Sequence, residues 1–112
     1  MSEHSFSLDL FYSEVEKTGK VYTIKDDKGY PAPKGADGKR SMPFWSTFSR
    51  AEKIVSTVAI YKGFSVEEMT VDDFKMWLKG LKKDGMFVGI NWSGPWGTGY
   101  DTKPEEVLER LG

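Results

Sequence analysis

The stretch TVDDFKMWLKGLKKDGMFVGI, residues 70–90, decides the fold class of this 112-residue chain. Thr70 is a helix-capping residue type, and the two aspartates that follow favour the positive end of a helix. An apolar stripe at helical spacing then predicts one buried face, and Gly85 ends the helix. The apolar run 86–90 has the length of a strand that is buried on both sides. The predicted buried stripe of the helix consists of Val71, Phe74, Trp77, Leu78 and Leu81.

Working outward, the residues before this stretch also predict helices and strands. A helix is expected over residues 8–18, because an apolar stripe at helical spacing precedes a glycine. Residues 21–24 are β-branched and aromatic, which favours a strand. Residues 30–40 contain two Pro and two Gly and predict an irregular loop, and residues 42–46 predict a short strand. The stripe of the first helix consists of Leu8, Phe11, Tyr12 and Val15.

Two further helices are predicted from capping signatures. Ser49-Arg-Ala-Glu52 fits a capping box, in which the serine caps the helix and the glutamate reaches back. This helix should end near residues 61–63, before a strand over residues 64–69. Thr102-Lys-Pro-Glu105 repeats the signature and predicts the last helix. Residues 91–101, which are rich in Gly and Pro, are expected to form a long loop.

These elements predict the α+β class. We expect a single two-layer domain with a mixed or antiparallel sheet of about four to five strands and helices mainly on one face. The length is consistent with one domain, since domains commonly have about 100–200 residues. Residues 1–7 are expected to be a mobile tail, and residues 8–112 to form the domain.

The composition excludes several classes of function. The chain has no Cys, so thiol nucleophiles, disulfides, iron–sulfur clusters and Cys-ligated zinc are excluded. Its single His, His4, lies in the expected tail and lacks the fixed geometry that a general base needs. The 16 Lys and Arg do not exceed the 17 Asp and Glu, so no nucleic-acid partner is expected. Without a signal peptide or a long apolar run, we expect a cytoplasmic protein with no membrane partner.

Three stretches, taken in order, resemble one small bacterial family. They are Val21-Tyr-Thr-Ile-Lys-Asp-Asp27, then Pro43-Phe-Trp-Ser46 with Ser49-Arg-Ala-Glu52, then Asp84-Gly85 through Asn91-Trp-Ser-Gly94. This arrangement resembles the Domain of Unknown Function 2750 over nearly the whole chain. The resemblance implies a compact, single-domain bacterial protein, and it implies no catalytic residue, cofactor or partner.

The predicted loop 91–101 is the first candidate binding surface. Trp92, Trp96 and Tyr100 are separated there by Gly and Pro, so they cannot share a helix face. Such aromatic side chains serve as interface anchors and as stacking platforms. Two interpretations remain open. The aromatic rings cover an open end of the core, or they form a binding surface together with Asn91 and Ser93.

The second candidate is the predicted junction between a strand and a capped helix at Trp45, Ser46, Ser49 and Arg50. Hydroxyl groups, free helix N–H groups and a guanidinium at one junction could hold an anion or a carboxylate. The alternative is that the serines only cap the helix and that Arg50 is an ordinary surface residue.

Other patterns have ordinary structural explanations. Neighbouring carboxylates on a helix or strand point apart, so adjacency alone builds no acid–base pair. Two of the four pairs here also suit a first helical turn, and one suits a turn. The glycine-rich stretch 89–99 lacks the spacing of a phosphate-binding loop or a dinucleotide-binding fingerprint. No catalytic, metal or cofactor residue is therefore predicted. The carboxylate pairs are Asp26/Asp27, Glu67/Glu68, Asp72/Asp73 and Glu105/Glu106.

Together, these observations predict a non-catalytic protein- or peptide-interaction module, such as an adaptor or an immunity protein, acting as a monomer or homodimer. Two alternatives are kept. One is a small-molecule or anion-binding domain that uses the junction at Arg50. The other is a hydrolase based on carboxylates, which would need two Asp or Glu side chains to converge in one pocket.

Overall fold

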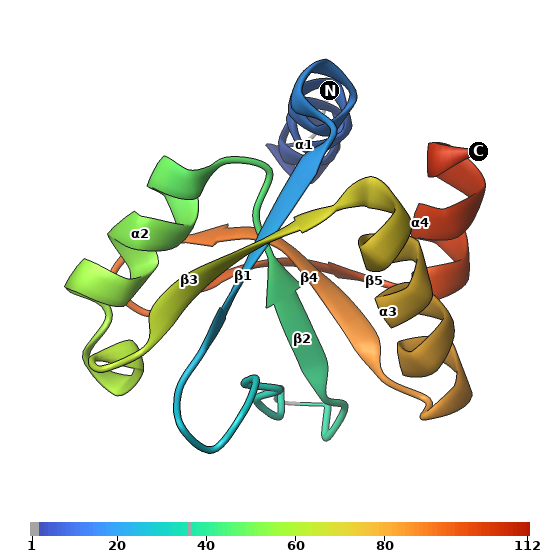
Figure 1. Ribbon diagram of the computed structural model, residues 1–112. Coiled ribbons are helices and arrows are strands. Elements are labelled where there is room, and N and C mark those ends of the chain that lie inside the picture. Colours follow the sequence, from blue (N-terminus) through green and yellow to red (C-terminus); the bar gives the residue numbers. More distant parts are fainter. Residues whose placement is uncertain (1–2, 36) are drawn as a thin grey trace.

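The computed structural model describes residues 3–35 and 37–112, which form four α-helices, one short 3-10 helix and five strands (Figure 1). In chain order these are α1 (Glu3–Thr18), β1 (Lys20–Lys25), β2 (Ser41–Phe44), α2 (Phe48–Thr57), η1 (Ala59–Tyr61), β3 (Ser65–Thr70), α3 (Val71–Lys83), β4 (Phe87–Ser93), β5 (Thr98–Thr102) and α4 (Pro104–Leu111).

The strands form two small sheets, which confirms the α+β class. β1 and β3 pair antiparallel, while β2 pairs parallel with β4, and β4 pairs antiparallel with β5. Two backbone hydrogen bonds between Tyr22 and Trp45, 2.7 and 2.8 Å long, connect the sheets just beyond the end of β2. The five strands match the predicted number, although they are divided between two sheets.

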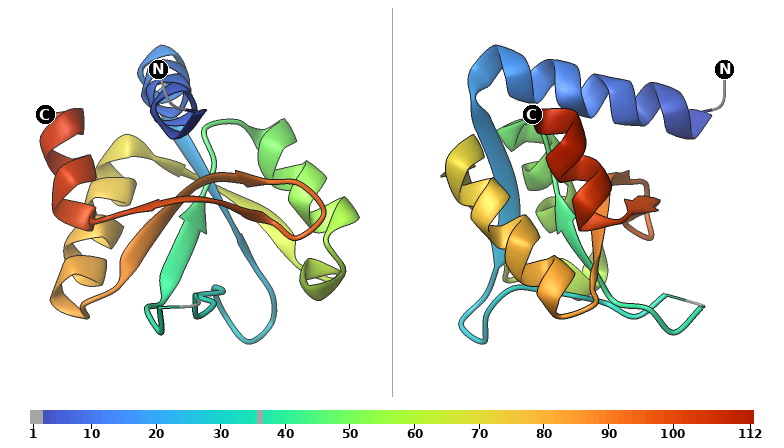
Figure 2. Two further views of the ribbon diagram at one scale, coloured as in Figure 1. Left: turned by 180° about the vertical axis from the view of Figure 1, so that it is seen from behind. Right: turned by 90° about the vertical axis from the view of Figure 1, so that its right-hand side faces the viewer.

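Two hydrophobic clusters fill the interior. The larger, here called the α1 cluster, includes apolar side chains of α1, α3 and α4, so three of the described helices share it (Figure 2). The smaller, here called the α2 cluster, lies under α2 and η1 and contains both Trp45 and Trp92. Every residue of β2 is buried. Within its sheet β2 is an edge strand that pairs only with β4, so the N–H that Pro43 lacks is not needed by a strand on the other side.

The first helix begins earlier than its apolar stripe predicted. α1 starts at Glu3 instead of near Leu8, so it includes residues of the expected tail. Met1 and Ser2, where that tail begins, lie outside the described residues, as does the side chain of His4. Phe11, Tyr12 and Val15 are buried as predicted, because helical spacing places them on the face that meets the sheet.

Two predicted helix caps were wrong. The cap of α2 is Thr47, whose hydroxyl accepts a hydrogen bond from the backbone N–H of Arg50, so Ser49 already lies inside the helix. Thr102 is the last residue of β5, and its hydroxyl donates to the carboxylate of Glu106. Thr70 does cap α3 as predicted, accepting from the N–H of Asp73 at 3.2 Å.

The predicted loop 91–101 was also wrong, because it contains the end of β4 and all of β5 except its last residue, Thr102. Thr98, Tyr100 and Thr102 alternate along β5 as strand residues do, but the intervening Gly99 and Asp101, which are rare in strands, hide this pattern. Gly94 and Gly97 have positive φ values of 83° and 61°, which allow the chain to reverse between the two strands.

Trp77 of α3 is not in the core, although helical spacing predicted that it would be. Its neighbours Phe74 and Leu78 are buried, whereas Trp77 is 36% exposed. Its ring packs edge-on against Tyr30 of the loop after β1, with ring centroids 4.8 Å apart. The apolar stripe of α3 is wider than the face that the sheet covers, so its margin remains at the surface.

Within the described part of the chain, no helix has both the length and the apolar character required to span a membrane.

Candidate functional site

The β4–β5 hairpin sends Trp92 to a different side of the sheet from the β4 residues before it. Val88 and Ile90 belong to the α1 cluster, and regular alternation would place Trp92 beside them. Asn91, however, has a positive φ of 47°, and pairing with β5 is irregular between Ile90 and Ser93. Trp92 therefore packs in the α2 cluster.

Two glycines make room for the Trp92 ring. A Cβ atom at Gly89 would lie 2.3 Å from Cε2 of Trp92, and one at Gly99 would lie 2.9 Å from Cδ1. Real carbon atoms do not approach so closely, so the indole requires both glycines. Trp92 is only 6% exposed, and its Nε1 donates to Oδ1 of Asp101 at 2.9 Å. Of the two interpretations left open for the aromatic rings, the position of Trp92 fits the first, in which the ring covers the core.

Trp45, another predicted binding residue, is also a core residue. It is fully buried in the α2 cluster, and its Nε1 donates to the backbone carbonyl of Trp92 at 2.8 Å. This bond links the start of α2 to the hairpin across the middle of the fold. Both rings are therefore buried in the α2 cluster.

The predicted carboxylate pocket at Ser46 and Arg50 exists, but the chain fills it with its own carboxylate. The hydroxyl of Ser46 donates to Oε1 of Glu14, in α1, at 2.6 Å, and Nε of Arg50 donates to the same oxygen at 3.0 Å. Asn91 completes the cluster, because its Oδ1 accepts from the N–H of Ser46 and its Nδ2 donates to the Ser46 hydroxyl, both at 3.0 Å.

This cluster stabilises the charged form of Glu14. Partial burial raises the pKa of Glu14, but the hydrogen bonds from Ser46 and Arg50, together with the charges of Arg50 and Lys17, hold the pKa below its ordinary value. The anion-binding chemistry predicted from the sequence is therefore present as an internal contact between α1, α2 and β4. Ser49 is outside the cluster: it is exposed, and its hydroxyl lies 3.3 Å from that of Thr47.

Trp96 differs from the other tryptophans because it is 81% exposed. It lies in the turn between β4 and β5, beside a cleft of about 260 Å³ that is also lined by Ile60 of η1. Ile60 is itself 70% exposed. We refer to Trp96, Ile60 and this cleft as the hairpin surface. The turn lies at the α2 side of the molecule (Figure 2).

Tyr100 does not belong to the hairpin surface. It pairs directly with Ile90 across the β4–β5 ladder, and residues in direct register share one face of a sheet. That face is the one of the α1 cluster, whereas Trp92 lies on the opposite face. Tyr100 is accordingly half-buried near Tyr12 of α1, whose pKa burial raises to about 12, with a smaller contribution from Tyr100.

The structure does bring several predicted residues together in a groove between α2 and the hairpin. This groove has a volume of about 430 Å³ and is lined by Arg50, Asn91, Trp92 and Ser93, together with Lys53, which was not predicted. Ser93 is exposed at its rim. The lining residues include two cations and no acidic residue.

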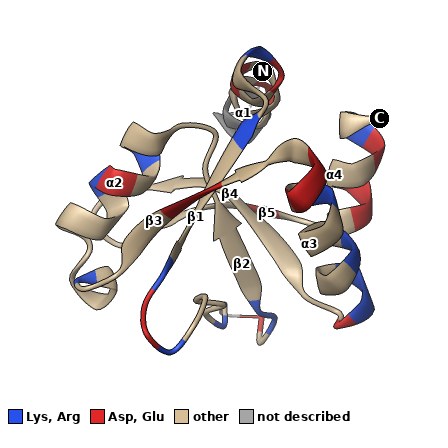
Figure 3. Cartoon of the chain, viewed as in Figure 1, with Lys and Arg blue, Asp and Glu red and all other residues tan. Residues whose placement is uncertain are grey.

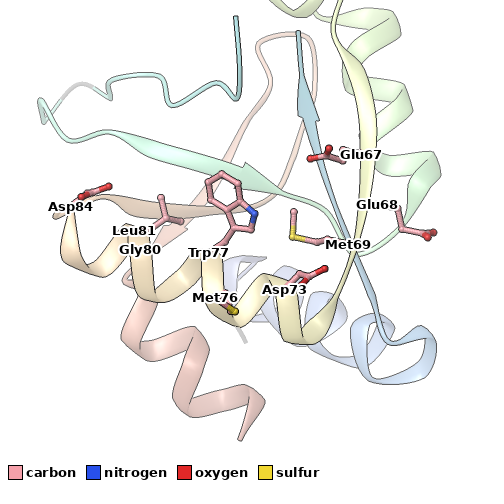
Figure 4. A pocket seen from close by; sticks show the side chains of 9 residues that line it. All are labelled: Glu67, Glu68, Met69, Asp73, Met76, Trp77, Gly80, Leu81 and Asp84. Atoms are coloured by element: carbon pink, nitrogen blue, oxygen red, sulfur yellow. The ribbon is translucent and has the colours of Figure 1, made fainter. Parts of the chain in front are cut away.

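A second cleft, of about 510 Å³, lies between α3 and β3 and was not predicted (Figure 4). We call it the α3 cleft. Its apolar lining includes Met76 and Trp77, and Met76 is 71% exposed. Its acidic residues are Glu67, Glu68, Asp73 and Asp84. Sequence reasoning missed it because Trp77 had been placed in the core.

The carboxylates of the α3 cleft do not converge on one point. Figure 4 shows Glu68 pointing to the opposite side of β3 from Glu67, and Asp84 at the far end of α3 from Asp73. The Glu67 carboxylate accepts a hydrogen bond from Tyr30, which is the main reason why its pKa is lowered, and it pairs with Lys25 at 3.0 Å. Among the described residues, no group of three or more His, Asp or Glu side chains is placed to hold a metal ion.

Part of a longer protein is similar to this chain. A protein named apyrase from Cimex lectularius is 34% identical to it over 83 residues, which are 69% of this chain and 22% of the apyrase. The chain thus spans less than a quarter of the length of that relative.

A family match covers almost the whole chain. The model for "Protein of unknown function (DUF2750)" matches residues 8–111, which include the hairpin, the Glu14 cluster and the α3 cleft. This match confirms the resemblance identified in the sequence, and the chain belongs to the DUF2750 family.

Proposed function

We propose that this protein is a non-catalytic interaction module that binds an apolar segment of another protein at the hairpin surface. The observation that carries the proposal is the exposure of Trp96, which leaves 81% of the residue in solvent beside the exposed Ile60. Tryptophan, with tyrosine and arginine, is enriched among the side chains that dominate binding energy at interfaces.

The hairpin surface is held in place by the core beneath it. Gly97 lies against η1, since a Cβ atom there would be 3.4 Å from both Val58 and Tyr61. On the other side, Trp92 anchors β4 to β5 through its bond to Asp101. A rigid support of this kind lowers the entropic cost of binding, because less of the surface has to become ordered.

The chemistry of the cleft favours an apolar anchor residue from the partner. Its lining includes Pro33, Ile60, Tyr61 and Trp96, with one basic and one acidic residue, Lys34 and Asp101. Neither sign of charge dominates, so burial of apolar surface is the main source of affinity.

The test is a selection of displayed peptides against the immobilised protein, followed by affinity measurements on variants. We expect the selected peptides to carry an apolar anchor, and to lose at least about tenfold in affinity with Trp96→Ala and with Ile60→Ala. Phe48→Ala is the matched control, because Phe48 is also an exposed aromatic residue, 55% accessible, but lies on α2 outside the cleft. Peptides that bind Trp96→Ala as well as the native protein, or a selection without enrichment, would refute the proposal.

A small anionic ligand in the groove between α2 and the hairpin is the second candidate. Arg50 and Lys53 line this groove without an acidic neighbour, although Arg50 is already paired with Glu14. A ligand present at about 100 times its Kd should stabilise the fold by about 2.7 kcal/mol. Thermal-shift measurements with phosphate, nucleotides and carboxylates test this candidate, with Lys53→Ala as the variant that removes the response. Because the similar protein from Cimex lectularius is named an apyrase, apyrase activity should be measured as well, in a separate assay.

A further inference from the structure

The α3 cleft differs in chemistry from the hairpin surface. Its helix, α3, lies on the other side of the molecule from α2 (Figure 1). We infer that the α3 cleft binds a basic amphipathic helix of another protein, whose apolar face packs on Met76, Trp77 and Gly80 and whose Lys or Arg side chains pair with the acidic residues at the two ends. This inference is independent of the function proposed for the hairpin surface.

The apolar floor of the cleft follows one face of α3. Asp73, Met76, Trp77, Gly80 and Asp84 recur at intervals of one, three and four residues, so they form a continuous stripe along the helix. Met76 and Trp77 expose apolar surface at the centre of this stripe, and the two aspartates lie at its ends.

Gly80 is the feature that favours a helix as the occupant. Glycine is among the least favourable residues inside a helix, and the φ of Gly80 is not positive, so its backbone does not require glycine. Apart from its chain neighbours and the backbone of α3 itself, no atom of the described chain lies within 4 Å of a Cβ placed there, so packing does not require glycine either. A small residue on a helix surface does allow a second helix to approach closely, because the interaxial distance depends on the side chains at the contact.

The charges that line the cleft favour a positively charged partner. None of the lining residues is basic, and the acidic positions lie on β3 and at both ends of α3 (Figure 3). Glu67 and Glu68 are paired with Lys25 and Lys20, whereas Asp73 and Asp84 form no ion pair with any described residue. These two aspartates are 11 positions apart, or about 16 Å along the helix axis. The partner helix should therefore carry cations about three turns apart, with small and apolar residues between them.

A second copy of the chain does not fit this arrangement. In an antiparallel pair of α3 helices centred on Trp77 and Gly80, Asp73 of one copy would face Asp84 of the other. In a parallel pair, each aspartate would face its own equivalent. Both arrangements juxtapose like charges, which opposes association.

The test uses a library of helical peptides, randomised on one face, that is displayed and selected against the full chain. The selected peptides should be basic at both ends of an apolar segment and should bind less tightly as salt is added. Met76→Lys should weaken binding at least about tenfold more than Met76→Glu. The two variants are a matched pair, since both remove the same exposed side chain and differ only in the sign of the charge.

Gly80→Ala separates binding from folding. It should raise the Tm by about 2–5 °C, because alanine favours the helix, and yet weaken the selected peptides about tenfold by preventing close approach. Lys79→Ala, at the neighbouring position outside the cleft, should leave binding within about twofold. Selection of acidic or uncharged peptides, no enrichment, equal affinity for both Met76 variants, or full affinity for Gly80→Ala would overturn the inference. Peptides that bind Met76→Lys normally but lose affinity with Trp96→Ala occupy the hairpin surface, and they would also count against the α3 cleft.

Discussion

Gly89 and Gly80 are two glycines without positive φ, and their surroundings give them opposite roles. At Gly89, in β4, a Cβ atom would overlap the Trp92 indole, with Cε2, Cζ2 and Nε1 all within 2.6 Å. At Gly80, in α3, it would meet open space. The sequence shows only a glycine at each position, whereas the three-dimensional neighbours decide what an added methyl group would do.

The same substitution at these two positions should consequently change stability in opposite directions. We expect Gly89→Ala to lower the free energy of unfolding by about 2–3 kcal/mol, as over-packing of a core does. Gly80→Ala should raise it by about 0.5–1 kcal/mol. Urea unfolding of both variants measures the difference. If Gly89→Ala were as stable as the native protein, the Trp92 ring could not lie on this glycine.

At the scale of elements, the β4–β5 hairpin depends on the conformation of Asn91. Its positive φ coincides with the irregular pairing that turns Trp92 into the α2 cluster, and its side chain bonds twice to Ser46. Asparagine suits both roles, because it tolerates the left-handed region better than most residues and carries a donor and an acceptor.

At Asn91, glycine should be a less destabilising replacement than alanine, which is the reverse of the usual order. Both Asn91→Ala and Asn91→Gly lose the bonds to Ser46, so each should destabilise the fold by about 1–3 kcal/mol. Alanine must also adopt the left-handed conformation, which costs about 1–2 kcal/mol more than it costs glycine. Asn91→Gly should therefore be the more stable variant in chemical denaturation. At the exposed Ser93, where φ is not positive, alanine should be the better replacement, and the same order at both positions would contradict this account.

At the scale of the whole molecule, Glu14 links α1 to the start of α2 and to β4. Its carboxylate accepts from Ser46 and Arg50, and Ser46 in turn bonds to Asn91. Three segments that are far apart in the chain therefore depend on one charged group whose side chain is 26% exposed. Because the folded protein lowers the pKa of Glu14, the stability that this group contributes is present above its ordinary pKa of 4.5 and is lost as the pH falls through the lowered value.

Glu14→Gln should remove this part of the pH dependence. Near pH 7 the variant should be less stable than the native protein by about 1 kcal/mol, a modest value because the ion pair is partly solvated. The difference should shrink towards zero as the pH falls from 4.5 through the lowered pKa, because the native Glu14 then also becomes protonated. Denaturant unfolding across this range measures it, and Glu16→Gln, an exposed glutamate on the same helix, controls for the loss of one charge. A difference that stayed constant with pH would show that the carboxylate charge is not responsible.

Local sequence patterns were sufficient for most of the elements. The apolar stripe of α1, the capped α3 and the buried strand β4 were predicted because helical spacing, caps and apolar runs depend on residues close together in the chain. The same local evidence failed for β5. Gly99 lowers the strand propensity of β5, and its purpose, space for the Trp92 ring, becomes apparent only when β4 and β5 lie side by side.

The sequence by itself determined the α+β class, the family and the residue types that a binding site could use. The tertiary structure decided which of those residues are available. It buried Trp45 and Trp92, exposed Trp96 and Trp77, and supplied Glu14 as the carboxylate at Ser46 and Arg50. The physical reason is the distance along the chain over which the interactions act. Secondary structure follows contacts over a few residues, whereas exposure and ion pairing depend on segments 30 or more residues apart, such as Glu14 with Ser46 and Trp45 with Trp92.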